Sequence, residues 1–166
     1  MKMFLKYNAV PIAESIFAVN TLELFNKLPA STRLALYDIF ANLFDTQQET
    51  LAKDMGASFV KAFVGLAEKE KDPSCLKIVF AIYKDTSSDK WALPVDSLKM
   101  SWDSFIRYYP ITVGGKRSDI SKPNPEVLKE LLLQCLLSSN HYAEWTFPYL
   151  IEMLDTVVSA NIKVFS

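Results

Sequence analysis

The chain has 166 residues, of which half are hydrophobic and 22% are charged, a length and composition typical of one folded domain. Its 18 basic and 19 acidic residues nearly balance, so it lacks the positive charge with which nucleic-acid-binding proteins neutralise phosphates. No apolar run approaches the roughly 18 residues of a membrane-spanning helix, and Lys6, Asn8 and Glu14 interrupt any signal-peptide core. These features predict a soluble intracellular protein that binds neither nucleic acid nor membrane.

Apolar residues at three- and four-residue spacing predict helices along nearly the whole chain. The first helix is expected from Pro11 to Lys27, and the second from about Ser31 to Phe44. A third is expected to open in "DTQQET" (45–50) and to run to about Glu68, with a split or bend at Gly56. The inward residues expected for the first helix are Ile12, Ile16, Val19, Leu22 and Phe25.

The stretch "EKDPSCLKIVF" (70–80) changes abruptly from charged to apolar, which predicts the start of a buried helix. Proline is tolerated at the first helical position, where its missing N–H would have no partner, so Pro73 fits there. The Asp72 carboxylate is expected to cap the free amides of the first turn. One buried stripe should contain Cys75, Leu76, Val79, Phe80 and Tyr83.

Residues 85–96 are polar and are expected to form a connecting loop before a fifth helix that ends ahead of Pro110. The buried side of that helix should carry Val95, Leu98, Trp102, Phe105 and Ile106. Asn124 as cap and Pro125 at the first position predict the start of a sixth helix. A seventh is expected over 140–156, with Pro148 as a kink or a late start, and "SANIKVFS" (159–166) resembles the beginning of an eighth.

The fold class that these patterns predict is all-α, because no segment alternates between apolar and polar residues as a half-buried strand would. Helices joined by short turns favour an antiparallel helix stack, an α-solenoid fragment of about seven to eight helices, over the rival compact bundle. Residues 1–166 are expected to form a single helical-repeat domain, a fragment of a longer solenoid. The apolar edge of such a fragment, expected at "IKVFS", predicts self-association or marginal stability.

Residues suited to catalysis or metal binding are sparse. His141 is the only histidine, and its place at a helix start predicts an exposed residue rather than a general base. Cys75 and Cys135 lie far apart in apolar stripes, which favours buried core thiols, although a disulfide between them stays open. We therefore expect no catalytic residues, no metal site and no cofactor.

Two carboxylate groups remain, and both are expected to be solvated. "EKEKD" (68–72) alternates in charge, which favours an exposed helix end and cap over a shared proton. Glu144, Glu152 and Asp155 are expected on the outer face of the seventh helix. Neither group offers the contrasting environments that acid–base catalysis requires.

A basic and aromatic cluster around the long irregular stretch is the best candidate surface for a protein partner, with a solvated loop as the alternative interpretation. The candidate residues are Arg107, Tyr108, Tyr109, Lys116, Arg117 and Lys122.

Four segments, taken in this order, form a recognisable set: "LPASTRLALYDIFANLF" (28–44), "GASFVKAFVGLAEKEKDPSCLKIVF" (56–80), "YYPIT" (108–112) and "NHYAEWTFPYLIEMLD" (140–155). Together they resemble the N-terminal region of the MMS nineteen family of HEAT-repeat proteins. The family's loop after the Tyr-Pro-Ile motif is proline-rich with an Asn-Asp-Pro turn, whereas this chain has "TVGGKRSDISKPNPEVL" (112–128) there. The resemblance covers roughly residues 21 to 165 and implies a HEAT-like α-solenoid.

The resemblance also implies a function, that of a non-catalytic scaffold. Family members act as the targeting subunit of the cytosolic iron–sulfur protein assembly complex. They help deliver clusters to apoproteins of DNA repair, replication and transcription, which implies a cytoplasmic and nuclear location. The implied partners are iron–sulfur assembly factors and iron–sulfur client proteins. Because the assembly factors contact mainly the family's C-terminal repeats, this chain is expected to contact clients or to pack the N-terminal part of the solenoid.

Two other classes remain open at this stage. An unrelated α-solenoid adaptor would share the helices but not the "EKDP" and "YYPI" segments at their spacing. A small helical enzyme would require a polar pocket that brings His141 and carboxylates together.

Overall fold

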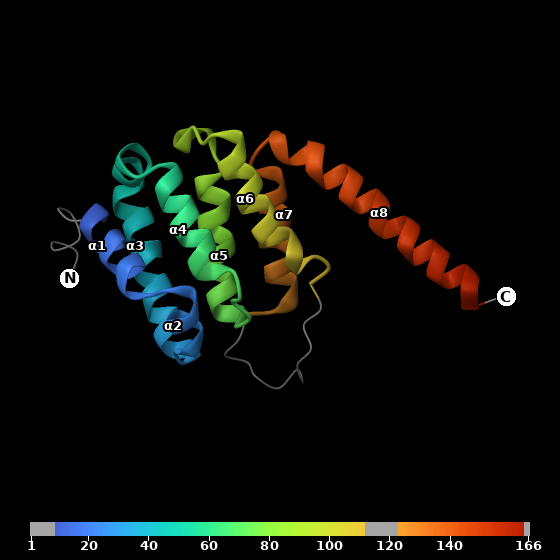
Figure 1. Cartoon of the computed structure of the whole chain (residues 1–166), viewed down its shortest axis with the longest axis horizontal. Coiled ribbons are helices and arrows are strands. Elements are labelled where there is room, and N and C mark those ends of the chain that lie inside the picture. The colour runs from blue at the N-terminus through green and yellow to red at the C-terminus, as the bar shows by residue number, and fades with distance from the viewer. Residues whose placement is uncertain (1–8, 112–122, 165–166) are drawn as a thin grey trace.

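The computed structural model describes residues 9–111 and 123–164, and in these ranges the regular structure is helical throughout (Figure 1). The α-helices are α1 (Ala9–Val19), α2 (Leu22–Lys27), α3 (Ala30–Asp54), α4 (Ala57–Ala67), α5 (Pro73–Thr86), α6 (Val95–Phe105), α7 (Pro125–Leu137) and α8 (His141–Val164). Two short 3-10 helices are η2 (Asp89–Trp91) and η3 (Ile106–Tyr108).

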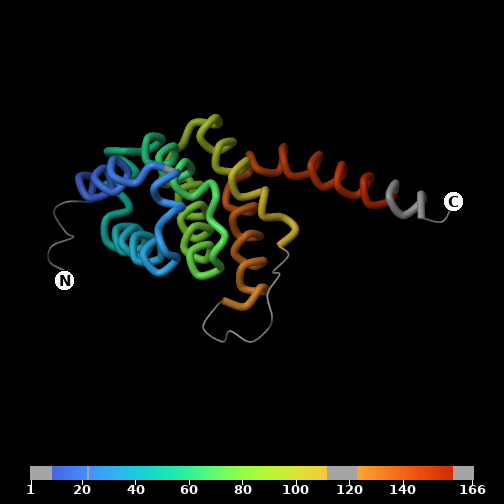
Figure 2. Tube along the Cα trace, turned by 60° about the horizontal axis from the view of Figure 1, so that its bottom comes forward, coloured from blue at the N-terminus to red at the C-terminus, as the bar shows by residue number. Residues whose placement is uncertain are grey.

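The helices form an open row of two layers rather than a closed bundle. In one layer α3 packs against α5 and α5 packs against α7; in the other α4 packs against α6 and α6 against the start of α8. From α3 to α7 consecutive α-helices run in opposite directions, and α8 extends away from the body at one end of the row (Figures 1 and 2). The all-α, antiparallel α-solenoid prediction is therefore confirmed.

The predicted first helix, from Pro11 to Lys27, is wrong because the chain turns between α1 and α2. The N–H of Asn20 donates to the carbonyl of Ile16 at 3.0 Å, and its side-chain amide donates to the same oxygen at 2.9 Å. Asparagine competes in this way with the helical backbone and ends helices. As a result Val19 is exposed, whereas Phe25 on α2 is fully buried.

The predicted break at "DTQQET" (45–50) is confirmed in its position, because two helical segments meet there at a kink, although they continue as one helix, α3. The helix kinks there at Gln47, whose backbone angles (φ −144°, ψ 30°) are not helical. The break at Gly56 is confirmed, since this residue has φ +48° and ψ −122° and separates α3 from α4. Only glycine adopts such a conformation without strain.

The start of α5 follows the prediction. Pro73 is its first residue, and the Asp72 carboxylate accepts hydrogen bonds from the N–H groups of Ser74 (2.9 Å) and Cys75 (3.3 Å). The predicted stripe is buried, with Cys75, Leu76, Val79, Phe80 and Tyr83 all inside.

The expected loop over 85–96 contains η2, whose Trp91 is buried and stacks on Phe44 of α3 with ring centroids 5.4 Å apart. On α6 four of the five predicted residues are buried, but Val95 is exposed because it lies at the N-terminal end of the helix. Sequence periodicity does not reveal where along a helix its packing begins.

The cap at Asn124 is confirmed, since its side chain accepts from the N–H of Glu126 at 3.1 Å. No separate eighth helix begins at 159, because α8 continues to Val164. Pro148 lies inside α8 on an exposed side. Because Glu144 is exposed as well, water can reach the helix where proline removes a backbone hydrogen bond.

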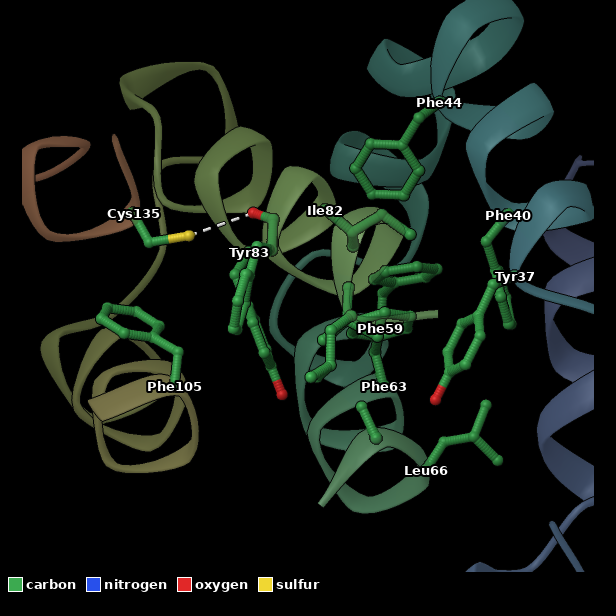
Figure 3. Packing of buried hydrophobic residues seen from close by; sticks show 14 of the residues in the cluster. Tyr37, Phe40, Phe44, Phe59, Phe63, Leu66, Ile82, Tyr83, Phe105 and Cys135 are labelled. Atoms are coloured by element: carbon green, nitrogen blue, oxygen red, sulfur yellow. Dashed lines mark hydrogen bonds between the residues drawn. The ribbon is translucent and has the colours of Figure 1, made fainter. Parts of the chain in front are cut away.

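Aromatic rings form a continuous chain of contacts through the core. The rings of Phe59 and Phe63 on α4 lie between Phe40 of α3 and Tyr83 of α5 (Figure 3). The chain continues from Tyr83 to Phe105 of α6, with ring centroids 5.9 Å apart. Edge-to-face and tilted ring pairs add stabilisation beyond the burial of their area.

Gly56, between α3 and α4, and Gly65, inside α4, give a matched test of the strain in the turn. Gly56→Ala should destabilise the protein by about 1–3 kcal/mol, because alanine is strained at this φ and its Cβ would lie 3.2 Å from the Ala52 carbonyl oxygen. Gly65→Ala, inside α4 with no atom within 4 Å of the new Cβ, should stabilise it by about 0.5–1 kcal/mol. Chemical denaturation measures both changes, and equal effects would contradict the assignment of strain to Gly56.

Candidate partner-binding surface

Several turns meet at one edge of the helical row around a buried ion pair. Arg33, near the start of α3, donates from Nε and Nη2 to the two carboxylate oxygens of Glu70, both at 2.8 Å. Glu70 lies in the turn between α4 and α5, and its side chain is only 1% exposed. Arg33 Nη1 also donates to the Leu28 carbonyl at 2.6 Å, so one guanidinium joins both turns.

The expectation that residues 68–72 are a solvated charge run is wrong for Glu70. Besides Arg33, its Oε1 accepts from the backbone N–H groups of Lys71 and Asp72, both at 2.9 Å. These donors satisfy a carboxylate that would otherwise be costly to bury. Nothing local in the sequence marks this role, because Arg33 lies 37 residues away.

The environment of Glu70 has opposing effects on its pKa. Burial favours the neutral acid and raises the pKa, whereas the hydrogen bonds from Arg33, Asp72 and Lys71 favour the carboxylate and lower it. The hydrogen bonds prevail, so the pKa of Glu70 is lowered. The hydrogen bond to Glu70 likewise outweighs desolvation and raises the pKa of Arg33.

The described part of the predicted partner surface extends from the same edge. Tyr108 in η3 is half-buried; its hydroxyl donates to the Glu70 carbonyl at 2.8 Å, and its ring packs edge-on against Phe80. Arg107 is exposed and pairs with Glu68, with 3.1 Å between Nη1 and Oε1. Tyr109 is exposed next to them.

The other three predicted residues, Lys116, Arg117 and Lys122, lie outside the described residues. The structure therefore places Arg107 and Tyr109 on an accessible surface and gives Tyr108 a packing role. The partner surface as a whole stays a prediction.

The side chains considered for catalysis or metal binding do not come together in one place. His141, Glu144, Glu152 and Asp155 are all exposed along α8. Across residues 9–111 and 123–164, no three metal-ligating side chains gather into a possible ion site. Within the same residues, no helix is long and apolar enough to span a bilayer.

Both cysteines are free and buried, which confirms their interpretation as core thiols. Burial, with the negative charges of Glu70 and Asp72, raises the pKa of Cys75 to about 12, and burial raises that of Cys135 to about 12. The Cys135 thiol donates to the Phe80 carbonyl at 3.1 Å (Figure 3). Both side chains are therefore neutral thiols at physiological pH, whereas nucleophiles and metal ligands act as thiolates.

Comparison with known proteins decides the family. The N-terminal model of the MMS19 family, described as "Dos2-interacting transcription regulator of RNA-Pol-II", matches residues 1–164. The chain belongs to the MMS19 family. This membership confirms the resemblance found in the sequence and excludes an unrelated α-solenoid. None of the solved structures matches the chain.

Relatives in this family are similar over most of the chain. The human "MMS19 nucleotide excision repair protein homolog" is 31% identical over 157 residues, which cover 93% of this chain and 15% of the relative. The yeast relative, a "DNA repair/transcription protein" of Saccharomyces cerevisiae, is 29% identical over 143 residues, covering 81% of this chain and 13% of the relative. The chain thus matches only about one seventh of the length of these MMS19 proteins.

Two Arg–Glu pairs at this edge differ in burial and allow a matched test. Arg33→Met should destabilise the protein by about 3 kcal/mol, because it leaves the buried Glu70 carboxylate without its cation. Arg107→Met breaks a pair whose side chains are 56% and 40% exposed, so solvent screening limits the loss to less than about 1 kcal/mol. Urea unfolding of both variants measures the difference, and similar losses would contradict the role given to Glu70.

The lowered pKa of Glu70 also predicts a pH dependence. The unfolded chain takes up the proton near the ordinary Glu value of 4.5, while the folded protein resists it to a lower pH. The stabilisation is therefore complete above about pH 4.5 and is lost as the pH falls through the lowered pKa. Glu70→Gln should be less stable than the parent at pH 7, and the gap should narrow towards pH 3 in thermal melts. A constant gap would show that Glu70 does not titrate differently on folding.

Proposed function

We propose that this chain is a non-catalytic scaffold of the cytosolic iron–sulfur protein assembly pathway. It would help deliver iron–sulfur clusters to apoproteins of DNA repair, replication and transcription. The observation that carries the proposal is the family match over residues 1–164, together with relatives named as nucleotide excision repair and DNA repair/transcription proteins. The specific link to iron–sulfur assembly rests on the resemblance of residues 28–44, 56–80, 108–112 and 140–155 to the family.

The architecture supports a role in protein binding. A row of helices offers extended surfaces on two layers and at its turns, which is how solenoids bind other proteins. The near-balanced charge gives no support to direct binding of nucleic acid. We propose that the chain has no catalytic residue and no resident cofactor.

The proposed partners are iron–sulfur assembly factors and iron–sulfur client proteins, met in both cytoplasm and nucleus. The family description names interaction with Dos2 and regulation of RNA polymerase II transcription, which fits a protein that acts through other proteins. We propose that residues 1–166 act as one helical-repeat domain. The proposed contact surface comprises Arg107, Tyr108, Tyr109, Lys116, Arg117 and Lys122.

Affinity purification of the full chain from a cell extract, followed by quantitative mass spectrometry, tests this function. Iron–sulfur assembly factors or their DNA-metabolism clients should be enriched with the unchanged protein. A variant with Lys116, Arg117 and Lys122 changed to Ala should recover them at least about fivefold less, because each lost contact costs up to about 1 kcal/mol.

The control removes the same charge elsewhere. Lys53, Lys61 and Lys77 are exposed on α3, α4 and α5, so changing these three to Ala should leave recovery unchanged. Equal losses in both triple variants would argue against a specific surface. Recovery of neither assembly factors nor clients would contradict the proposed function.

A further inference from the structure

Helix α8 has two apolar faces, and the first is packed against the body of the protein. Tyr142 is fully buried, and Trp145 and Tyr149 lie against Trp102 of α6, with ring centroids 6.1 and 5.9 Å apart. The Trp102 indole N–H donates to the hydroxyl of Thr146 at 3.0 Å. These contacts fix the rotation of α8 about its axis and therefore which residues point away from the body.

The second apolar face, the outer stripe, points into solvent. Its residues are spaced by four, three and four positions, which aligns them along one side of a helix. They are Phe147 (66% exposed), Ile151 (59%), Leu154 (64%) and Val158 (55%). In Figures 1 and 2 this part of α8 stands clear of the other helices. Single exposed apolar residues are normal, but a contiguous row of four large ones is typical of an interaction site.

The charges beside the outer stripe have one sign. Glu144 and Asp155 lie seven residues before and four residues after Ile151, so both border the stripe. Glu152 adds a third carboxylate, and from His141 to Val158 the sequence contains no Lys or Arg.

Lysines on the two helices that pack against α8 are already paired on their own helices. Lys99 of α6 forms an ion pair with Asp103 and lies over the Trp102 ring. Lys129 of α7 pairs with Glu126, with 2.8 Å between Nζ and Oε1. The acidic border of the outer stripe therefore has no partner among these cations.

A second copy of the chain matches this surface poorly. If two α8 helices packed antiparallel about the centre of the outer stripe, the Asp155 side chains of both copies would lie on the same side of the interface, within about one helical turn of the symmetry axis. Like charges brought together in this way oppose association. The favourable occupant has apolar residues along one side and positive charges beside them.

We propose that the outer stripe of α8 is the docking site for an amphipathic helix of another polypeptide whose apolar stripe is bordered by Lys or Arg. Apolar packing along the stripe provides the attraction, and the acidic border selects the basic partner. This docking does not depend on the proposed role in iron–sulfur assembly.

Two synthetic helical peptides of about 18 residues test the proposal. Both carry leucines at the four-three-four spacing; one has Lys at the bordering positions and the other has Glu. In calorimetric titrations of the full chain, the Lys peptide should bind at least about tenfold more tightly, and about 0.5 M salt should reduce this preference.

Three variants separate the apolar and the charged contributions. The double variant Phe147→Ser with Ile151→Ser should weaken binding of the Lys peptide at least about tenfold. The double variant Glu144→Lys with Asp155→Lys should reverse the preference towards the Glu peptide. Val19→Ser, which changes an exposed valine at the other end of the row, should leave binding unchanged. Circular dichroism melts confirm that each variant is folded.

Equal binding of the two peptides, binding of neither, or binding unaffected by the Phe147/Ile151 double change would overturn the proposal. Sedimentation velocity gives a further result that would do so. If the chain is a dimer that the same double change dissociates, a second copy occupies the outer stripe.

Discussion

The row of helices depends on a chain of aromatic contacts that crosses every layer of the core. It begins where Phe17 of α1 stacks on Phe40 of α3, with ring centroids 5.1 Å apart, and it ends on α8, where Phe105 meets Tyr142 at 5.3 Å. The pairs Phe17–Phe40, Phe63–Tyr83 and Phe105–Tyr142 each join two helices, whereas α7 has no aromatic residue and packs beside this line against α5. Such a core grows in one direction, helix by helix.

Polar contacts fix the helices relative to one another at points where aromatic packing alone would let them slide. The Tyr83 hydroxyl bonds to Ser104 at 2.7 Å, and the Tyr142 hydroxyl bonds to Ser87, so two core tyrosines fix neighbouring helices relative to each other. At the edge of the row, Glu70 plays the same part with Arg33. Buried polar groups that are fully hydrogen-bonded specify one arrangement among several of similar apolar packing.

These features are compatible with the protein-binding role proposed above. Buried side chains serve packing, and the groups capable of chemistry are either dispersed, like His141, or held neutral, like Cys75 and Cys135. The two accessible surfaces differ in character: Arg107 and Tyr109 at the helix corner are polar and charged, whereas the outer stripe of α8 is apolar with an acidic border. The proposed scaffold therefore presents two surfaces of different chemistry.

Local sequence determined the helical class and the start of several helices. Caps such as Asp72 and Asn124 act on amides within three residues, and Gly56 breaks a helix through its own backbone. Neighbouring residues in the sequence are therefore enough to predict these helix boundaries. The tertiary structure alone decided that Glu70 is buried and that Val95 is exposed. The partners of Glu70 and of Cys135 lie 37 and 55 residues away along the chain, and no local sequence pattern predicts contacts between residues so far apart. The outer stripe shows the same limit: the sequence analysis expected only carboxylates on the outer face of this helix, and packing alone shows that a row of apolar side chains is exposed there as well.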